Sequence, residues 1–147
     1  MGKEAQIVPE NIILFHINIL KSEIREKGKE RNPKYDLNVA HTTMHNLKDE
    51  RIKITLLLNL SDDKNKKGNE VNFEIEFHYS IKDLKNFYEL ENDQPAFTAN
   101  LIATILGISF STARGILYER LANTNFQGVI LPVISPIKML STKTKSE

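Results

Sequence analysis

The sequence predicts an α+β fold, in which a four-stranded antiparallel sheet carries two C-terminal helices packed on one face. In the first half of the chain, apolar and polar residues alternate with the period of two that is typical of strands. In the second half, apolar residues recur with the period of a helix. Strands followed by helices, instead of alternating with them, favour the α+β class. The length of 147 residues suits one domain, residues 1–147, with a buried core.

The sheet is expected within residues 10–81, and its first strand is rich in β-branched residues. Residues 12–20 are predicted to form the first strand. The period of two gathers four of its side chains on one face, namely Ile13, Phe15, Ile17 and Ile19. Residues 35–44 alternate well enough to form the second strand. The charged stretch between the two strands, with Gly28 and Pro33, is expected to be a solvated loop or a twisted strand end.

The third and fourth strands show the clearest alternation. Residues 51–60 are predicted to form the third strand, with an inward face made of Ile52, Ile54, Leu56, Leu58 and Leu60. Residues 61–70 combine turn residues with charge and indicate the tip of a long hairpin. Residues 71–79 are predicted to form the fourth strand, with an inward face made of Val71, Phe73, Ile75, Phe77 and Tyr79. Polar residues fill the alternate positions, so we expect the other face of this sheet to meet water.

The two helices are expected within residues 92–123. The first begins after Asn92 or Asp93, either of which can cap a helix. Over residues 96–106 this helix has apolar residues on nearly every side, which predicts burial on more than one face. Gly107 is expected to end it.

One sheet cannot cover a helix that is apolar all round. The simplest remedy is a second copy of the protein, so we expect an oligomer, a dimer or a dimer of dimers, with helices between sheets. The residues expected at this interface are Phe97, Leu101, Ile102 and Ile105.

The second helix is expected at residues 109–122, where small residues in the first turns let another element approach closely. Residues 124–140 then form an apolar run that is interrupted by Pro132 and Pro136. Because proline excludes both a regular helix and a central strand, we expect an extended segment half buried beside the second helix. Residues 141–147 are predicted to be a polar tail.

The composition excludes several kinds of site. The chain has no cysteine, and no carboxylate pair completes a ligand set around His41 and His45, so neither a metal nor another cofactor is expected. Sequence motifs of nucleotide-binding and hydrolytic enzymes are missing, which indicates a protein that is not an enzyme. The net charge of +1 gives no footprint for nucleic acid. With no signal-peptide core and no long apolar span, the chain is expected to be cytoplasmic, without membrane insertion.

The order of four strands, two helices and an extended proline-containing segment resembles SecB, the protein-export chaperone. The resemblance covers about residues 11–140. It is strongest over residues 113–139, where the stretch 125–128 corresponds to a short link and the stretch 131–136 to an apolar proline-bearing segment. The resemblance implies paired sheets with sandwiched helices in a homotetramer. It also implies an ATP-independent holdase that binds unfolded or pre-export polypeptides before translocation.

The chain departs from the family in its charge. SecB proteins are typically acidic and meet the SecA motor through an acidic sheet surface. This chain is slightly basic and carries only Glu74 and Glu76 on its clearest outward strand face. SecA binding is therefore expected to be weak or missing. Some SecB-like proteins act outside export and guard an antitoxin, and the resemblance admits that dedicated role here.

A holdase needs apolar side chains that are open to a partner. We expect client binding by aromatic and aliphatic residues of the loop after the fourth strand, of the second strand and of the C-terminal segment. They are Phe87, Tyr88, Leu90, Tyr35, Leu37, Val39, Val129, Leu131, Val133 and Ile134. Phe87 and Tyr88 are expected to stand at the rim of a groove.

Two other functions stay open at the level of sequence. One is a dedicated chaperone or adaptor for a single partner, such as an antitoxin. The other is a small-ligand enzyme of the hot-dog type, which would need an acid or amide in a pocket at the start of the buried helix. Asn92, Asp93 and Gln94 form the only such cluster.

Overall fold

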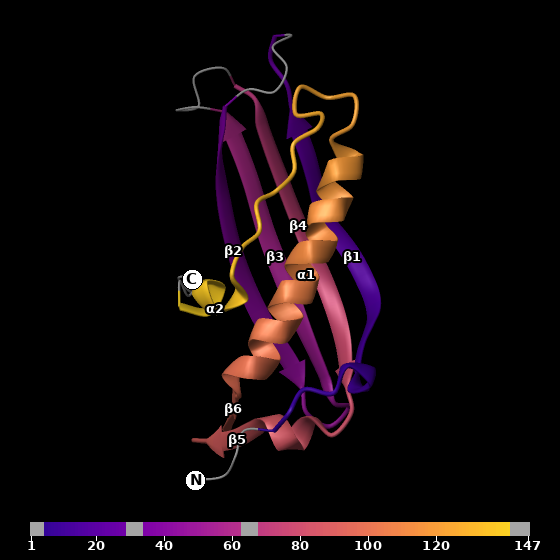
Figure 1. The fold of residues 1–147 in the computed structure, drawn as a ribbon, viewed down its shortest axis with the longest axis vertical. Helices are drawn as coiled ribbons and strands as arrows, with labels where there is room; N and C mark the ends of the chain where they lie inside the picture. Colours follow the sequence, from indigo (N-terminus) through magenta and orange to yellow (C-terminus); the bar gives the residue numbers. More distant parts are fainter. Residues whose placement is uncertain (1–4, 29–33, 63–67, 142–147) are drawn as a thin grey trace.

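The computed structural model describes residues 5–28, 34–62 and 68–141. Four long strands form one antiparallel sheet in the order β1-β4-β3-β2 (Figure 1). Their bounds are β1 Ile12–Arg25, β2 Tyr35–Asn46, β3 Arg51–Asp62 and β4 Glu70–Ile81. The predicted α+β class and all four predicted strands are confirmed, and each strand is longer than expected.

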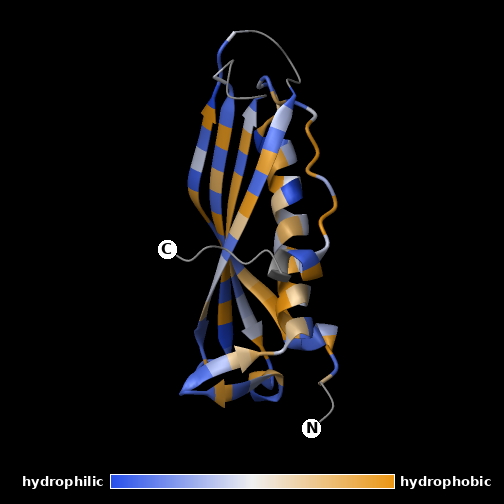
Figure 2. Cartoon of the chain, turned by 90° about the vertical axis from the view of Figure 1, so that its left-hand side faces the viewer, coloured by the Kyte–Doolittle hydropathy of each residue, from blue (hydrophilic) through white to orange (hydrophobic). Residues whose placement is uncertain are grey.

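The core lies on one face of the sheet, beneath the long helix α1, Ala99–Arg120 (Figure 1). Alternate residues of β3 and β4 are buried there, as predicted, with Ile52 to Leu60 and Val71 to Tyr79 no more than 2% exposed. The helix contributes Leu101, Ile105, Leu106, Phe110, Ala113 and Leu117. Seen edge-on, the sheet has α1 and the C-terminal segment on one side, and no helix or strand of the described residues covers its outer face (Figure 2).

The predicted alternation of β1 is wrong because the strand contains two irregularities. The register shifts between Leu14 and His16, and again between Ile19 and Lys21. Each extra residue reverses the side to which the following side chains point. Ile12, Leu14 and Ile19 therefore pack against the core, whereas Ile13 and Phe15 are exposed.

A single helix stands where two were predicted. Gly107 lies inside α1 with helical geometry and does not end it, because the tertiary contacts on both sides outweigh its low propensity. Asn92 and Asp93 do not cap the helix. Both adopt positive φ angles, 53° and 65°, and form the turn between β5, Tyr88–Glu91, and β6, Gln94–Phe97. Two such residues fit a tight hairpin turn.

The C-terminal segment leaves α1 through a turn in which Asn123 and Gly128 have positive φ angles. It then runs extended beside the helix to residue 135, as predicted, and Leu131 is buried. The expectation of an extended run to residue 140 is wrong, because Pro136 begins the short helix α2, Pro136–Ser141. Proline suits a first helical position, where its missing N–H would have no partner. Residues 142–147 of the predicted polar tail lie outside the described residues.

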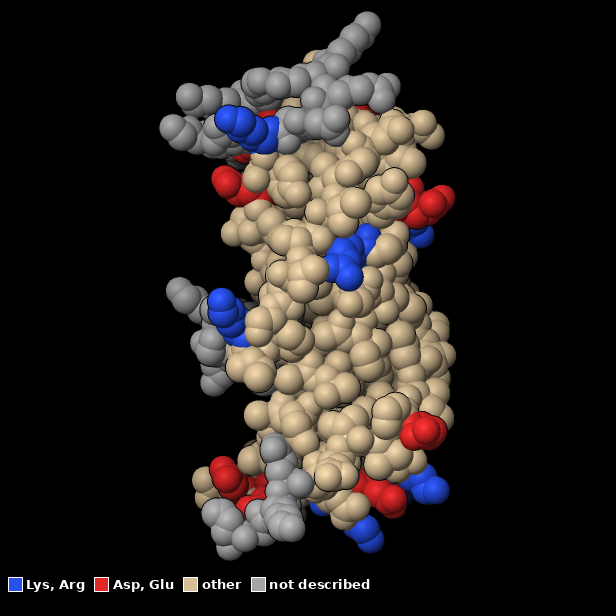
Figure 3. Space-filling model, in the orientation of Figure 1, with Lys and Arg blue, Asp and Glu red and all other residues tan. Residues whose placement is uncertain are grey.

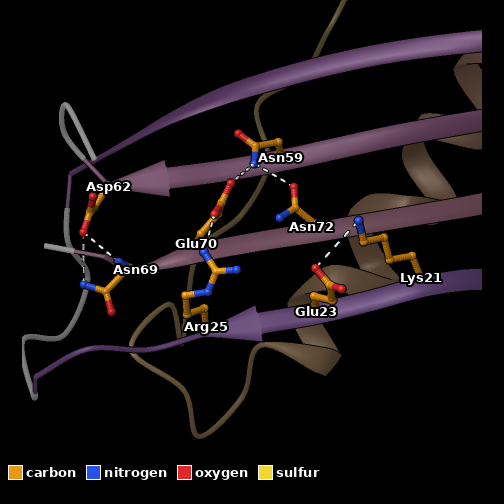
Figure 4. Close-up of polar contacts among 8 residues, drawn as sticks. All are labelled: Lys21, Glu23, Arg25, Asn59, Asp62, Asn69, Glu70 and Asn72. Carbon is orange, nitrogen blue, oxygen red and sulfur yellow. Dashed lines mark hydrogen bonds and ion pairs between the residues drawn. The ribbon is translucent and has the colours of Figure 1, made fainter. Parts of the chain in front are cut away.

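Two sets of polar contacts fix the layers against each other. The Tyr79 hydroxyl donates to the Ile105 carbonyl oxygen at 3.1 Å and lies 2.7 Å from Ser109 Oγ, which joins β4 to α1. Burial raises the pKa of Tyr79 to about 12, against the opposing hydrogen bond with Ser109. At the other end, Asn125 Nδ2 donates to Asn69 Oδ1, and the Asn69 backbone N–H donates to Asp62 Oδ2 at 2.9 Å. Asp62 and Asn69 appear at the end of the β3–β4 hairpin in Figure 4.

Candidate functional site

A groove of about 760 Å³ runs between α1 and the C-terminal segment. The sequence brings these two elements together because Leu131 enters the core while Val129 and Ile134 pack against its edge. One wall belongs to the helix, and the other is built from residues 133–137. The helix residues that line the groove are Ala103, Thr104, Gly107, Ile108, Phe110, Ser111, Thr112 and Arg114.

Small residues one helical turn apart line the groove along α1 and leave space above the helix. Ala103, Gly107 and Ser111 are spaced by four residues, so they lie in one row along α1. A side-chain carbon on Gly107 would come within 3.2 Å of the Pro136 ring, closer than ordinary contact. Gly107 therefore sets how closely α2 can approach the helix and how wide the groove is.

The groove offers little polar chemistry although it contains threonines. Thr104 Oγ1 donates to the Asn100 carbonyl oxygen at 2.7 Å, and Thr112 Oγ1 donates to the Ile108 carbonyl oxygen at 2.8 Å. Both hydroxyl protons are thus used within the helix, and Arg114 is the charged lining residue. Among the described residues, no group of three or more His, Cys, Asp or Glu side chains is arranged to hold a metal ion. The arrangement suits contact with apolar side chains and provides no evident catalytic group.

Apolar side chains at the groove remain exposed to solvent. Val133 is 86% exposed and Ile137 is 69% exposed, while Ile108 on the helix is 36% exposed. On the same face of the molecule, most Asp and Glu side chains lie toward the two ends (Figure 3). Contiguous exposed apolar residues in a region with few acidic side chains are typical of an interaction surface.

The structure divides the predicted C-terminal client residues into two groups. Val133 and Ile134 line the groove, and Val133 is free to contact another molecule. Leu131 is only 2% exposed and belongs to the core, so it does not line the groove as the sequence led us to expect. Val129 is half-buried against the core.

The predicted aromatic rim is not formed. Phe87 is only 6% exposed, because the short helix η3, Leu84–Phe87, turns it into the core. Tyr88 is half-buried with its ring edge-on to Phe97, at 5.7 Å between ring centroids. Leu90 is 61% exposed on the β5–β6 hairpin, and it does not line the groove.

The predicted client residues of the second strand also lie away from the groove. Tyr35, Leu37 and Val39 are half-buried on the inner face of β2, which is an edge strand of the sheet. The alternative cluster for an enzyme site, Asn92 to Gln94, is exposed at a hairpin turn. It therefore does not supply an acid or amide inside a pocket at the start of α1.

Most of the residues expected at an oligomer interface are used inside one chain. Leu101 and Ile105 are fully buried between α1 and the sheet, and Ile102 is 9% exposed. Phe97 is half-buried between Tyr88 and His45. The sheet thus covers a larger part of the helix than the sequence suggested, and Tyr118, 51% exposed, belongs to the uncovered side. The sequence analysis did not identify Ala103 and Gly107 as residues that line the groove. Their four-residue spacing with Ser111, which places three small residues in one row of the helix, was the signal that could have identified them.

The outer face of the sheet carries charge of both signs. Figure 4 shows Lys21 beside Glu23, at 3.7 Å, and Arg25 beside Glu70, at 2.9 Å. Glu76 pairs with Lys53 at 3.1 Å. Desolvation acts to raise the pKa of Glu76, but hydrogen bonds from Lys53 and His78 outweigh it and leave the pKa below its ordinary value. The carboxylates at Glu23, Glu70 and Glu76 are thereby compensated, and they do not form a uniformly acidic surface.

The fold agrees with that of one chaperone of known structure. No family model matches the sequence, and no curated protein matches it. A SecB-like chaperone from Mycobacterium tuberculosis, solved in complex with a ChAD peptide from the HigA1 antitoxin, matches with a TM-score of 0.61 and 13% identity, covering 86% of this chain and 91% of that one. A protein of unknown function from Streptococcus agalactiae matches with a TM-score of 0.35 and 16% identity, covering 82% of this chain and 96% of that one. The chain therefore has a SecB-like fold.

Proposed function

We propose that this chain is a chaperone or adaptor that binds extended apolar segments of other polypeptides in the groove between α1 and the C-terminal segment. The observation that supports the proposal most is the exposure of Val133 and Ile137 along a groove without catalytic groups. An apolar groove tolerates many sequences, because contact between aliphatic side chains is not directional. The M. tuberculosis chaperone of similar fold was solved with a bound antitoxin peptide, which is consistent with this role.

Binding in a single groove would be weak. Burying about 400 Å² of apolar client surface is worth roughly 10 kcal/mol at about 25 cal/mol per Å². Association and ordering cost on the order of 4–15 kcal/mol. Several grooves that engage one long chain raise the affinity through effective concentration. We therefore include in the proposal an oligomer that uses the uncovered side of α1 near Tyr118, and binding that needs no ATP.

A dedicated partner is the second candidate within the same class. The compensated carboxylates on the outer face favour it over an export role, because an acidic surface for SecA is not formed by Glu23, Glu70 and Glu76. The chemistry expected of the partner segment is extended and apolar, as in the first proposal. An antitoxin segment is one such partner.

Light scattering from an aggregating unfolded protein tests the proposal. The wild-type chain should suppress aggregation, and the double variant Val133→Ser with Ile137→Ser should need at least about tenfold more protein, since two aliphatic contacts are lost. Leu57→Ser is the matched control, because Leu57 is 39% exposed on the outer face of the sheet. The proposal fails if the groove variant and the control suppress aggregation equally well, or if the wild-type chain has no effect.

A further inference from the structure

A second pocket lies on the outer face of the sheet, opposite α1. Its volume is about 230 Å³, and its outward side chains are Phe15, Met44, Asn46, Arg51, Lys53 and His78. The strand register explains the grouping, because Lys53 pairs with Met44 on β2 and with His78 on β4, so all three point to the same face. The groove described above faces the other side of the sheet.

Phe15 of β1 supplies the aromatic wall of this pocket. Phe15 follows the core-facing Leu14 and points to the outer face, where it is 46% exposed, and the register shift between Leu14 and His16 lies at this residue. The Arg51 guanidinium carbon lies 4.8 Å from the centre of the Phe15 ring, a distance typical of a cation–π contact. Met44, 59% exposed, also lines the pocket. The outer face thus carries an exposed aromatic ring in contact with a cation.

The charges around the pocket leave one cation unpaired. The Glu76 carboxylate lies 3.1 Å from both Lys53 Nζ and His78 Nε2, so its two oxygens already interact with those groups. Asp49 is hydrogen-bonded to Asn46. Within residues 5–28, 34–62 and 68–141, no carboxylate forms an ion pair with Arg51. The guanidinium is therefore held in place by an aromatic ring while its N–H donors stay available to an anion.

We propose that this pocket binds an acidic segment of a partner protein, with one large apolar side chain between Phe15 and Met44 and a neighbouring carboxylate on Arg51. The size favours a peptide over a small molecule, because sites that enclose a small ligand are usually about 300–1,000 Å³, whereas 230 Å³ suits one large side chain. A planar guanidinium with free donors matches a carboxylate. The inference does not rest on the proposed function. Because the two sites face opposite sides of the sheet, a client and this partner can bind at once.

Fluorescence anisotropy with a labelled synthetic peptide tests the inference. The probe carries one phenylalanine between glutamates, and two reference peptides replace the glutamates by lysine or the phenylalanine by alanine. The acidic aromatic peptide should bind saturably and more weakly at high salt, and Arg51→Gln and Phe15→Ser should each weaken binding about tenfold. Arg25→Gln is the matched control, since Arg25 lies on the same face but pairs with Glu70. It should bind the peptide like wild type.

Circular dichroism of each variant confirms that it is folded, which is expected because Arg51 and Phe15 are exposed. The inference is overturned if the acidic peptide shows no saturable binding up to about 1 mM. It is also overturned if the lysine peptide binds as well, or if Arg25→Gln weakens binding as much as Arg51→Gln. An excess of unfolded client should not displace the peptide, and displacement would place the peptide in the α1 groove instead.

Discussion

Replacing Gly107 with alanine tests the contact that sets the width of the groove. Gly107 is inside α1, and a Cβ atom there would lie 3.2 Å from the Pro136 ring. Gly115 lies in the same helix, and a Cβ atom there would meet nothing within 4 Å. The two glycines therefore differ in what an added methyl group would touch, while both lie well inside the helix.

The expected magnitudes follow from this difference. Alanine in a helix interior is more favourable than glycine by about 0.5–1 kcal/mol, so Gly115→Ala should raise the free energy of unfolding by that amount. At Gly107 the same gain is opposed by a steric contact, because the new methyl group presses on the Pro136 ring, which must move by a few tenths of an ångström. We expect the two effects to offset, with a net change within about 0.5 kcal/mol of zero.

Urea unfolding of a double-mutant cycle separates the two effects. Pro136→Ala removes the ring atom that the new methyl group would meet, so Gly107→Ala should recover the full helix gain in that background. The coupling free energy between the two sites should be about 0.5–1 kcal/mol. If Gly107→Ala stabilises the protein as much as Gly115→Ala in both backgrounds, α2 does not rest on Gly107 in solution, and the groove is not shaped as described.

Three further changes probe the fold and its charges. Tyr79→Phe should lower the free energy of unfolding by about 1–3 kcal/mol, because the buried Ser109 hydroxyl loses its hydrogen-bond partner. In urea titrations, the double variant Tyr79→Phe with Ser109→Ala should lose less stability than the sum of the losses in the two single variants. Glu76→Gln should be less stable than wild type near neutral pH. Because the pKa of Glu76 is lowered in the folded state, this difference should vanish as the pH falls through that pKa, and a difference that persists in acid would contradict the ion pair. Asp93→Gly should raise the melting temperature, since glycine accepts the positive φ of 65° in the hairpin turn without strain; an unchanged or lower value would exclude that turn.

The sequence alone predicted strands β3 and β4, because strict alternation of apolar and polar residues there matches the alternation of buried and exposed side chains. In β4, every second side chain from Val71 to Tyr79 is buried, and the period of two predicts that arrangement directly. In β1 the same rule failed, because nothing in a run of β-branched residues marks where an extra residue interrupts the ladder. The first interruption lies at Phe15 and separates this exposed side chain from the core-facing Ile19, although the period of two placed both on one face.

The helix and the site depended on contacts that a single sequence does not reveal. The local sequence at Gly107 predicts a helix end, yet the helix continues because the residues around Gly107 pack against the sheet and Pro136. Phe87 reads as a loop aromatic, but η3 turns it into the core, so Phe87→Ala is expected to destabilise the fold by about 3–5 kcal/mol. The apolar and proline-bearing character of the C-terminal segment was visible in the sequence. Its pairing with the small residues of α1 was not.

Site-specific photo-crosslinking tests the central claim most directly. A photoreactive amino acid at Val133, in the wall of the groove, should crosslink to an unfolded client and not to the same client once folded. The same group at Leu57, on the outer face of the sheet, should crosslink to neither. Equal crosslinking of the unfolded client from Val133 and Leu57, or crosslinking from Leu57 alone, would contradict the assignment of the groove as the polypeptide-binding site.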